Sequence, residues 1–454
     1  MRGGWDDQGM LRAAPKGRAD WTTILSREED RLLRDAFGRH GGNAAARAAA
    51  APVVARYQQM SGGMWFLCNC RPEGGRHPVL VPVALTHIRR HEDAHWPAHH
   101  EDCAFFRDPS EQAAFLRSYG RVQAAPLRLA RAFGKASAPL EKAIVGTSHA
   151  NGRPRLARLL MRLVDAAGLQ RLDAGERIPL LVDQVKSIWR AARNVEIDEG
   201  VQLSEFLCTS PGRHGELFEK VAAAPAGRFK ETRPHGVLIA RIGAVSAGVL
   251  EPLAGEPLAV SGRVAVFGEG VGGTRETPAA RAARAPYLGA CVVGRSAENG
   301  EVEIVSAYLH PCASPSHLML VDSDYERQTL AQLRSLQAWI GAKRSVSMTI
   351  EKPVFDLLDH GNADEGAAGR GPCIPDFVLR ATGVGAGGRQ TAIVETMGYS
   401  DETYWAGKER MHKTMSAALA GAPVVLHDLS RGASGEADRE FWLGLMRLIV
   451  GRCA

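Results

Sequence analysis

The chain has 454 residues, 45% of them hydrophobic and 23% charged, which is typical of a globular protein with several domains. No apolar run approaches the roughly 20 residues that cross a bilayer, and the amino-terminal residues lack the apolar core of a secretory signal, so we expect a cytoplasmic protein without a membrane partner. The net charge of +6 permits nucleic acid as a partner, and eight cysteines in a reducing cytoplasm do not form a disulfide framework.

A helix over residues 27–37 is the first predicted element. Ser26 and Glu29 have the spacing of a capping box, in which each side chain accepts a hydrogen bond from the other residue's backbone N–H. The Ala-rich stretch 43–59 follows and predicts helical structure on both sides of Pro52.

Cysteines and histidines flank the strand-like residues that come next. Cys68 and Cys70 precede the strands, and a histidine-rich stretch leads to Cys103. Because thiolates and imidazoles satisfy a tetrahedral Zn²⁺, we predict a structural zinc site, with either His99 or His100 as the fourth ligand. The alternative is a group of buried thiols beside surface histidines.

The segment after this region predicts helices. Residues 155–167 carry apolar side chains at helical spacing and end before Gly168, and a second helix is expected over 180–193. The polar residues of the second helix include Lys186, Arg190 and Arg193. Two helices with a short turn indicate either a helix-turn-helix that binds DNA or a packed pair with a solvated basic face.

Residues 153–169 resemble a segment of an uncharacterised bacterial family whose members are often encoded on plasmids and integrative conjugative elements. That family also has a Cys-x-Cys pair and a His…Cys pair, similar to Cys68-Asn-Cys70 and His99-to-Cys103. The resemblance implies a mobile-element context, with conjugation or DNA-processing proteins as partners, and no established activity.

Short apolar runs separated by Gly-rich loops fill residues 235–310 and predict one antiparallel sheet. Beyond them, a helix that starts near Tyr325 is followed by candidate strands and helices. These are strands over 345–350, 353–358 and 424–426, and helices over 403–419 and 441–450. The order of elements predicts an α/β domain.

Two carboxylates lie in a predicted hairpin of this last domain. Its strands are residues 373–379 and 391–397, joined by the Gly-rich turn 383–388, and they contain only Asp376 and Glu395 as acidic residues. Neighbouring hard oxygen ligands suit Mg²⁺, which can polarise a phosphodiester and activate water. We therefore predict a magnesium site here.

The same residues resemble the PD-(D/E)XK nuclease superfamily over roughly 325–430. Pro375-Asp376 matches the first half of the motif and Glu395 matches the second acid, whereas Met397 stands where the lysine is expected. Some members carry this lysine on the following helix, where Lys408 is the candidate.

The resemblance implies a Mg²⁺-dependent nuclease acting on DNA, with Asp376, Glu395 and Lys408 as catalytic residues. It also implies a glutamate on the first helix that faces the metal, a role that Glu326 fits, although a first-turn glutamate equally complements the helix dipole. Two alternatives stay open. Met397 favours a fold without catalysis that binds nucleic acid or a partner, and the cysteines favour a zinc-stabilised scaffold.

The expected fold class is a multi-domain α/β (α+β) chain with a zinc-binding amino-terminal region and a restriction-endonuclease-like core at the carboxyl end. The expected divisions are a helical lead-in (1–60), a zinc module (61–110), a helical region (111–230), a β-rich region (231–320) and the nuclease-like domain (321–454).

Overall fold

The computed structural model places the chain in two compact units. The first comprises residues 1–118, 137–152 and 360–372, and the second comprises 119–136, 153–359 and 373–454. The described residues are 11–16, 22–38, 44–60, 63–70, 76–83, 85–91, 96–106, 119–121, 127, 129, 153–267, 284–296, 299–343, 346–358, 372–384, 388–398, 402–430 and 435–449. Within these residues, no helix is both long and apolar enough to span a membrane.

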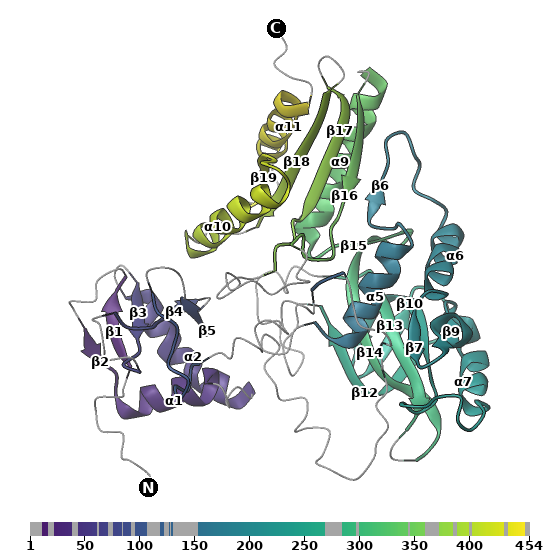
Figure 1. Cartoon of the computed structure of the whole chain (residues 1–454), viewed down its shortest axis with the longest axis horizontal. Coiled ribbons are helices and arrows are strands. Elements are labelled where there is room, and N and C mark those ends of the chain that lie inside the picture. Colours follow the sequence, from purple (N-terminus) through teal and green to yellow (C-terminus); the bar gives the residue numbers. More distant parts are fainter. Residues whose placement is uncertain are drawn as a thin grey trace. The chain divides into compact units, whose positions relative to one another are not determined.

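Among its described residues, the first unit contains a five-stranded antiparallel sheet of order β2-β1-β3-β4-β5 and the helices α1 and α2 (Figure 1). These are β1 (Arg12–Pro15), β2 (Thr23–Ile24), α1 (Arg27–Phe37), α2 (Ala44–Gln59), β3 (Met64–Leu67), β4 (Val79–Val83) and β5 (His87–His91). The predicted capping box is confirmed, because Glu29 N donates to Ser26 Oγ at 3.2 Å and Ser26 N donates to Glu29 Oε2 at 2.9 Å. Pro52 lies inside one continuous helix, α2.

The second unit begins with helices and short strands. They are α5 (Arg155–Ala166), β6 (Arg171–Leu172), α6 (Leu181–Ala192), β7 (Glu196–Asp198), β8 (Val201–Gln202), the 3₁₀ helix η2 (Leu203–Phe206), β9 (Leu207–Cys208), the 3₁₀ helix η3 (Pro211–Arg213) and α7 (His214–Ala222). Gly168, at a φ of +72°, follows α5 and provides the left-handed residue that ends such helices. Of the two alternatives for this pair, the helix-turn-helix does not fit, because residues 167–180 separate α5 from α6 and contain β6, whereas that motif needs a turn of about three or four residues.

The β-rich region forms a seven-stranded sheet of order β11-β12-β14-β13-β10-β9, with β15 paired to β14. Its remaining strands are β10 (His235–Ser246), β11 (Val249–Pro252), β12 (Leu258–Val266), β13 (Tyr287–Arg295), β14 (Val302–Ser314) and β15 (His317–Leu320). The prediction of a purely antiparallel sheet is wrong, because β12 runs parallel to β14 and β9 runs parallel to β10.

In the described residues of the carboxyl-terminal part, a five-stranded sheet of order β19-β18-β17-β16-β6 is accompanied by the helices α9, α10 and α11 (Figure 1). Its elements are α9 (Asp324–Lys343), β16 (Ser347–Glu351), β17 (Phe377–Val384), β18 (Gly388–Met397), α10 (Glu402–Ala418), β19 (Val424–Asp428) and α11 (Gly435–Ile449). Only β18 and β19 pair in parallel. Residues 353–358 do not form the predicted strand, since Pro353 has no N–H for a ladder and the chain leaves the sheet after Glu351.

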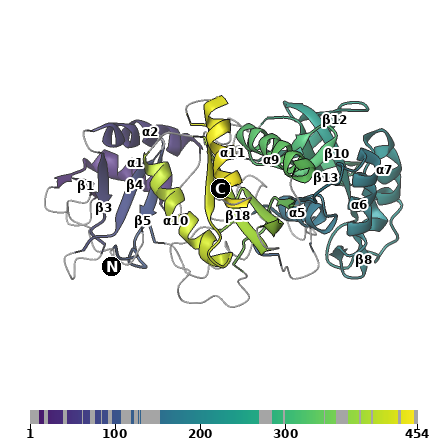
Figure 2. The same ribbon diagram turned by 90° about the horizontal axis from the view of Figure 1, so that it is seen from above.

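Helices cover both faces of this sheet. One core joins Leu333 of α9 and Phe441 of α11 to Phe377 and Val394 of the hairpin, and α9 and α11 lie beside β18 in both views (Figure 1 and Figure 2). A second core places α10 against Ile393 on the opposite face. Successive side chains of a strand alternate between faces, so Glu395 shares the α10 face with Ile393.

Candidate functional site

The paired strands β17 and β18 position the two predicted carboxylates. Phe377 pairs with Val394, so Asp376, directly before β17, lies beside Glu395 at the same end of the hairpin. The Glu395 side chain has no exposed surface and that of Asp376 is 13% exposed. The sequence prediction that these acids converge is therefore matched by the geometry.

Backbone N–H groups orient each carboxylate. Asp376 N donates to Glu395 Oε1 at 2.9 Å, and Thr396 N donates to Asp376 Oδ2 at 2.7 Å. The other oxygen of each acid lies near the Lys408 ammonium, with Nζ 2.5 Å from Glu395 Oε2 and 4.0 Å from Asp376 Oδ1. Two carboxylate oxygens thus converge on one cation. Negatively charged oxygen ligands of this kind are the ones that a hard divalent ion prefers.

Helix α10 brings two basic side chains to this pair. Lys408 and His412 are one helical turn apart and share a face, and His412 Nε2 lies 3.6 Å from Glu395 Oε2. Burial opposes ionisation of Glu395, but the Lys408 charge and the Lys408 hydrogen bond, with the His412 ring close by, lower its pKa to about 2. Burial and the neighbouring Glu395 charge raise the pKa of Asp376 instead, because two adjacent carboxylates repel each other.

Glu326 has different partners from those the sequence suggested. It is 4% exposed near the start of α9, where its Oε2 accepts from Asp322 N at 2.9 Å and lies 3.0 Å from Lys352 Nζ. Burial raises its pKa well above the ordinary value. Asp376 contributes to this shift, so Glu326 lies within electrostatic reach of the hairpin acids.

Sequence reasoning missed Lys352 and its partner Asp322. Lys352 Nζ lies 3.2 Å from Asp322 Oδ2, and Asp322 Oδ1 lies 3.2 Å from His310 Nε2 of β14. The sequence did contain a signal for this buried charge, because Lys352 lies between two apolar runs, 345–350 and 353–358. Such a charge at the end of a buried strand requires a carboxylate partner, but the sequence does not identify which one.

Met397 occupies the position where the superfamily motif has its lysine. It lies two residues after Glu395 on β18, on the same face of the strand, and is fully buried. A thioether supplies neither a charge nor a hydrogen-bond donor. The ammonium nearest to the two acids therefore comes from α10.

The predicted zinc ligands of the first unit form a compact cluster. The ligand atoms of Cys68, Cys70, His99 and Cys103 all lie within 4.8 Å of one another. Cys103 Sγ is 3.6 Å from Cys68 Sγ and 3.4 Å from His99 Nδ1, and Cys70 Sγ is 3.5 Å from that nitrogen. Zn–S bonds of about 2.3 Å in a tetrahedron place sulfur atoms at comparable separations. This cluster can bind a metal.

The structure distinguishes the two candidate histidines. His99 is 1% exposed and belongs to the cluster, whereas the His100 ring points to Asp102, whose backbone N lies 3.3 Å from its Nδ1. Only the backbone N of His100 approaches the cluster, donating to Cys70 Sγ at 3.4 Å. The neighbouring Cys103 and Cys68 thiols lower the pKa of Cys70, which favours the thiolate form that binds a metal.

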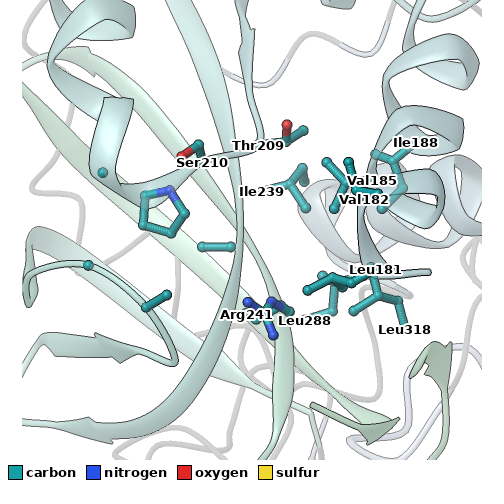
Figure 3. A pocket seen from close by; sticks show the side chains of 15 residues that line it. Leu181, Val182, Val185, Ile188, Thr209, Ser210, Ile239, Arg241, Leu288 and Leu318 are labelled. Carbon is teal, nitrogen blue, oxygen red and sulfur yellow. The ribbon is translucent and has the colours of Figure 1, made fainter. Parts of the chain in front are cut away.

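A separate apolar cavity of about 420 Å³ lies between α6 and β10 (Figure 3). Leu181, Val185 and Ile239 line it, with Arg241 among the apolar side chains. The Arg241 guanidinium donates to Pro315 O at 2.8 Å. None of the predicted site residues lines this cavity.

Comparisons with known proteins agree with the fold of the carboxyl-terminal part. Residues 322–447 match the family model of the restriction endonuclease-like C-terminal domain, which confirms the predicted fold class. Residues 11–109 and 123–312 match two domains of unknown function, DUF8534 and DUF8535.

A curated relative has no assigned activity. An uncharacterised protein in the cib 5′ region of Escherichia coli is 29% identical over 153 residues, which cover 34% of this chain and 63% of that protein. The chain thus matches less than two thirds of the relative's length. No solved structure matches this chain.

Proposed function

We propose that this protein is a metal-dependent nuclease that hydrolyses phosphodiester bonds of DNA. The observation that carries the proposal is the convergence of Asp376 Oδ1 and Glu395 Oε2 on one half-buried ammonium, Lys408 Nζ, in a restriction endonuclease-like domain. The test is incubation of the purified chain with linear and circular DNA in Mg²⁺ or Mn²⁺, compared with a chelator. Cleavage that requires the divalent ion is the expected result.

The two acids fit a magnesium ion. Each has one oxygen fixed by a backbone N–H and one directed to the shared cation position, so Asp376 and Glu395 would hold the ion without rearranging the hairpin. The ion would supply charge stabilisation and a more acidic bound water. The chain itself orients the carboxylates, excludes solvent from Glu395, and places a second positive charge beside them.

Lys408 is proposed to stabilise the negative charge that develops on the reacting phosphate. Replacing it by methionine keeps the length and removes the charge. We expect Lys408→Met to reduce cleavage by about 100-fold, the size typical of removing one electrostatic group, while Mg²⁺ affinity stays within a few-fold of the wild type. Single-turnover cleavage and calorimetric Mg²⁺ titration measure the two effects separately.

The control for this variant is Lys343→Met, which removes an exposed lysine from the end of α9. It should cleave DNA at the wild-type rate. Equal cleavage rates for Lys408→Met and the wild type would show that Lys408 has no catalytic role.

The proposed nucleic acid contacts are to phosphates rather than to base edges. Arg190 is exposed on α6, Arg193 is exposed directly after this helix, and Lys413 is exposed on α10, five residues after Lys408. Contacts of this kind release counterions, so we expect DNA affinity to fall by about 10- to 100-fold between about 50 and 200 mM salt, with little sequence preference. Fluorescence anisotropy with two unrelated duplexes measures both, and salt-independent affinity would contradict this prediction.

We further propose that the cysteine–histidine cluster of the first unit holds a structural Zn²⁺. Four nitrogen and sulfur ligands form a closed tetrahedral set, which leaves no coordination position for a substrate. The ligands Cys68, Cys70, His99 and Cys103 are buried or half-buried in the core of that unit. A role in folding rather than in catalysis follows from this enclosure.

The cellular setting stays a proposal. The resemblance of residues 153–169 to proteins encoded on plasmids and conjugative elements supports a mobile-element protein that acts with DNA-processing partners. The division into a helical lead-in, a zinc module, a helical region, a β-rich region and a nuclease-like domain is likewise proposed, as is a cytoplasmic location.

A further inference from the structure

A buried lysine lies beside the proposed nuclease site and is not used by the proposed mechanism. Lys352 follows β16 and is 3% exposed, with its Nζ 3.0 Å from Glu326 Oε2 and 3.2 Å from Asp322 Oδ2. Removing an ammonium from water is costly unless carboxylates and hydrogen bonds replace the solvent. Two carboxylates provide that compensation here.

The position of this ammonium is fixed from several sides. The Lys352 backbone N donates to Gln170 O at 2.8 Å, and Gln170 Nε2 donates back to Lys352 O at 3.3 Å. The Phe377 ring, whose centroid is 5.8 Å from Nζ, packs against it from β17. With almost no exposed surface, Lys352 is placed to neutralise acids of the domain and not to contact a DNA phosphate.

The charges at this end of the sheet are coupled to one another. Asp376 lies within electrostatic reach of both Glu326 and Lys352. Burial raises the pKa of Glu326, whereas the adjacent Lys352 ammonium favours its ionised form. At full ionisation, the carboxylates of Asp322, Glu326, Asp376 and Glu395 carry four negative charges. The two ammonium groups of Lys352 and Lys408 leave a formal charge of −2. One divalent ion neutralises this charge, and a second would leave an excess of positive charge.

We propose that Lys352 Nζ is a built-in cation that takes the place of a second divalent ion, so that the nuclease site binds a single metal ion, at Asp376 and Glu395. This inference deepens the proposed function and rests on it. In two-metal sites the second ion stabilises the leaving oxygen. In a one-metal site of this kind the leaving oxygen has to be stabilised by a side chain. Lys352 then replaces the charge of the second ion, whereas Lys408, the ammonium that lies at the two acids, replaces its contact with the leaving oxygen.

The test counts bound ions on the full-length protein. Zinc-loaded wild type, Asp376→Asn and Lys352→Met are dialysed to equilibrium against Mn²⁺, and manganese and zinc per chain are measured by elemental analysis. Mn²⁺ suits oxygen ligands, whereas the cysteine–histidine cluster prefers zinc. The expected manganese counts are one for the wild type, none for Asp376→Asn and two for Lys352→Met, with zinc unchanged. Lys343→Met, the exposed-lysine control, should bind one.

The stability of the variants provides a second readout. Without divalent ions, Lys352→Met should melt at a lower temperature than the wild type, because Asp322 and Glu326 are left without their cation. Mn²⁺ should raise its melting temperature more than that of the wild type. The double variant Lys352→Met/Glu326→Gln removes one charge of each sign, and we expect it to fold and to bind one ion. If Lys352→Met does not fold, the manganese counts of the wild type and of the double variant test the proposal instead.

The outcomes separate this inference from the nuclease proposal. Two manganese ions on the wild type, or one on folded Lys352→Met, would overturn the inference and leave the nuclease proposal standing. One ion without cleavage of DNA would overturn the nuclease proposal and support the single-ion site. No bound ion on the wild type would overturn both.

Discussion

Asp376→Asn is expected to reduce DNA cleavage by about 100-fold or more, the size seen when one preorganised charge or donor is lost from an active site, and to weaken Mg²⁺ binding in parallel. Asparagine keeps the shape of the side chain and a carbonyl oxygen that can accept the hydrogen bond from Thr396 N. The change therefore removes the charge and leaves the hairpin intact. Glu395 then remains with Lys408, and the pair of acids that requires a further cation no longer exists.

Cleavage and calorimetric Mg²⁺ titration are measured on the same preparation, with Glu440→Gln as the control. Glu440 is exposed on α11, so its neutralisation should change neither quantity. Wild-type cleavage by Asp376→Asn would show that the chemistry occurs elsewhere. Absence of cleavage by the wild type itself, in both Mg²⁺ and Mn²⁺, would favour the alternative of a nuclease fold that only binds nucleic acid or a partner.

Local patterns were sufficient to predict the hairpin and its two acids. Alternation and turn residues define β17 and β18, and their pairing places Asp376 beside Glu395 because the register of a short hairpin is set by its turn. The helix predicted over 403–419 corresponds to α10. Once the helix packs against the face that carries Glu395, Lys408 can reach the acids, so this candidate followed from sequence order and the family resemblance.

Contacts between distant segments were not predictable in the same way. β6 is two residues long in a region expected to be helical, yet it pairs with β16 across about 180 residues of chain. The parallel pairing of β12 with β14 likewise depends on which strands become neighbours, which alternation within a strand does not encode. The Lys352–Glu326 ion pair required both β16 and α9 to be in place, so neither residue alone indicated it.

Loss of zinc is expected to unfold the amino-terminal unit while the nuclease-like domain stays folded. Zinc binding by structural sites is worth about 10–16 kcal/mol in small peptides, and it is available only when the ligands are assembled. Here the ligands hold together separate segments, because Cys68 and Cys70 follow β3 whereas His99 and Cys103 lie beyond β5. Chelation should therefore increase hydrogen exchange throughout residues 11–106 and leave the sheet that carries Asp376 protected.

The histidine pair provides the sharpest control for this prediction. His99→Ala removes a cluster ligand, whereas His100→Ala changes the adjacent residue, whose ring points to Asp102. We expect His99→Ala to lose most of its zinc and to resemble the chelated protein, and His100→Ala to retain one zinc per chain. Cys208→Ser, outside the cluster, should also retain zinc. Equal zinc contents of the two histidine variants, measured by elemental analysis, would contradict the assignment of His99, and zinc-free wild type would contradict the site as a whole.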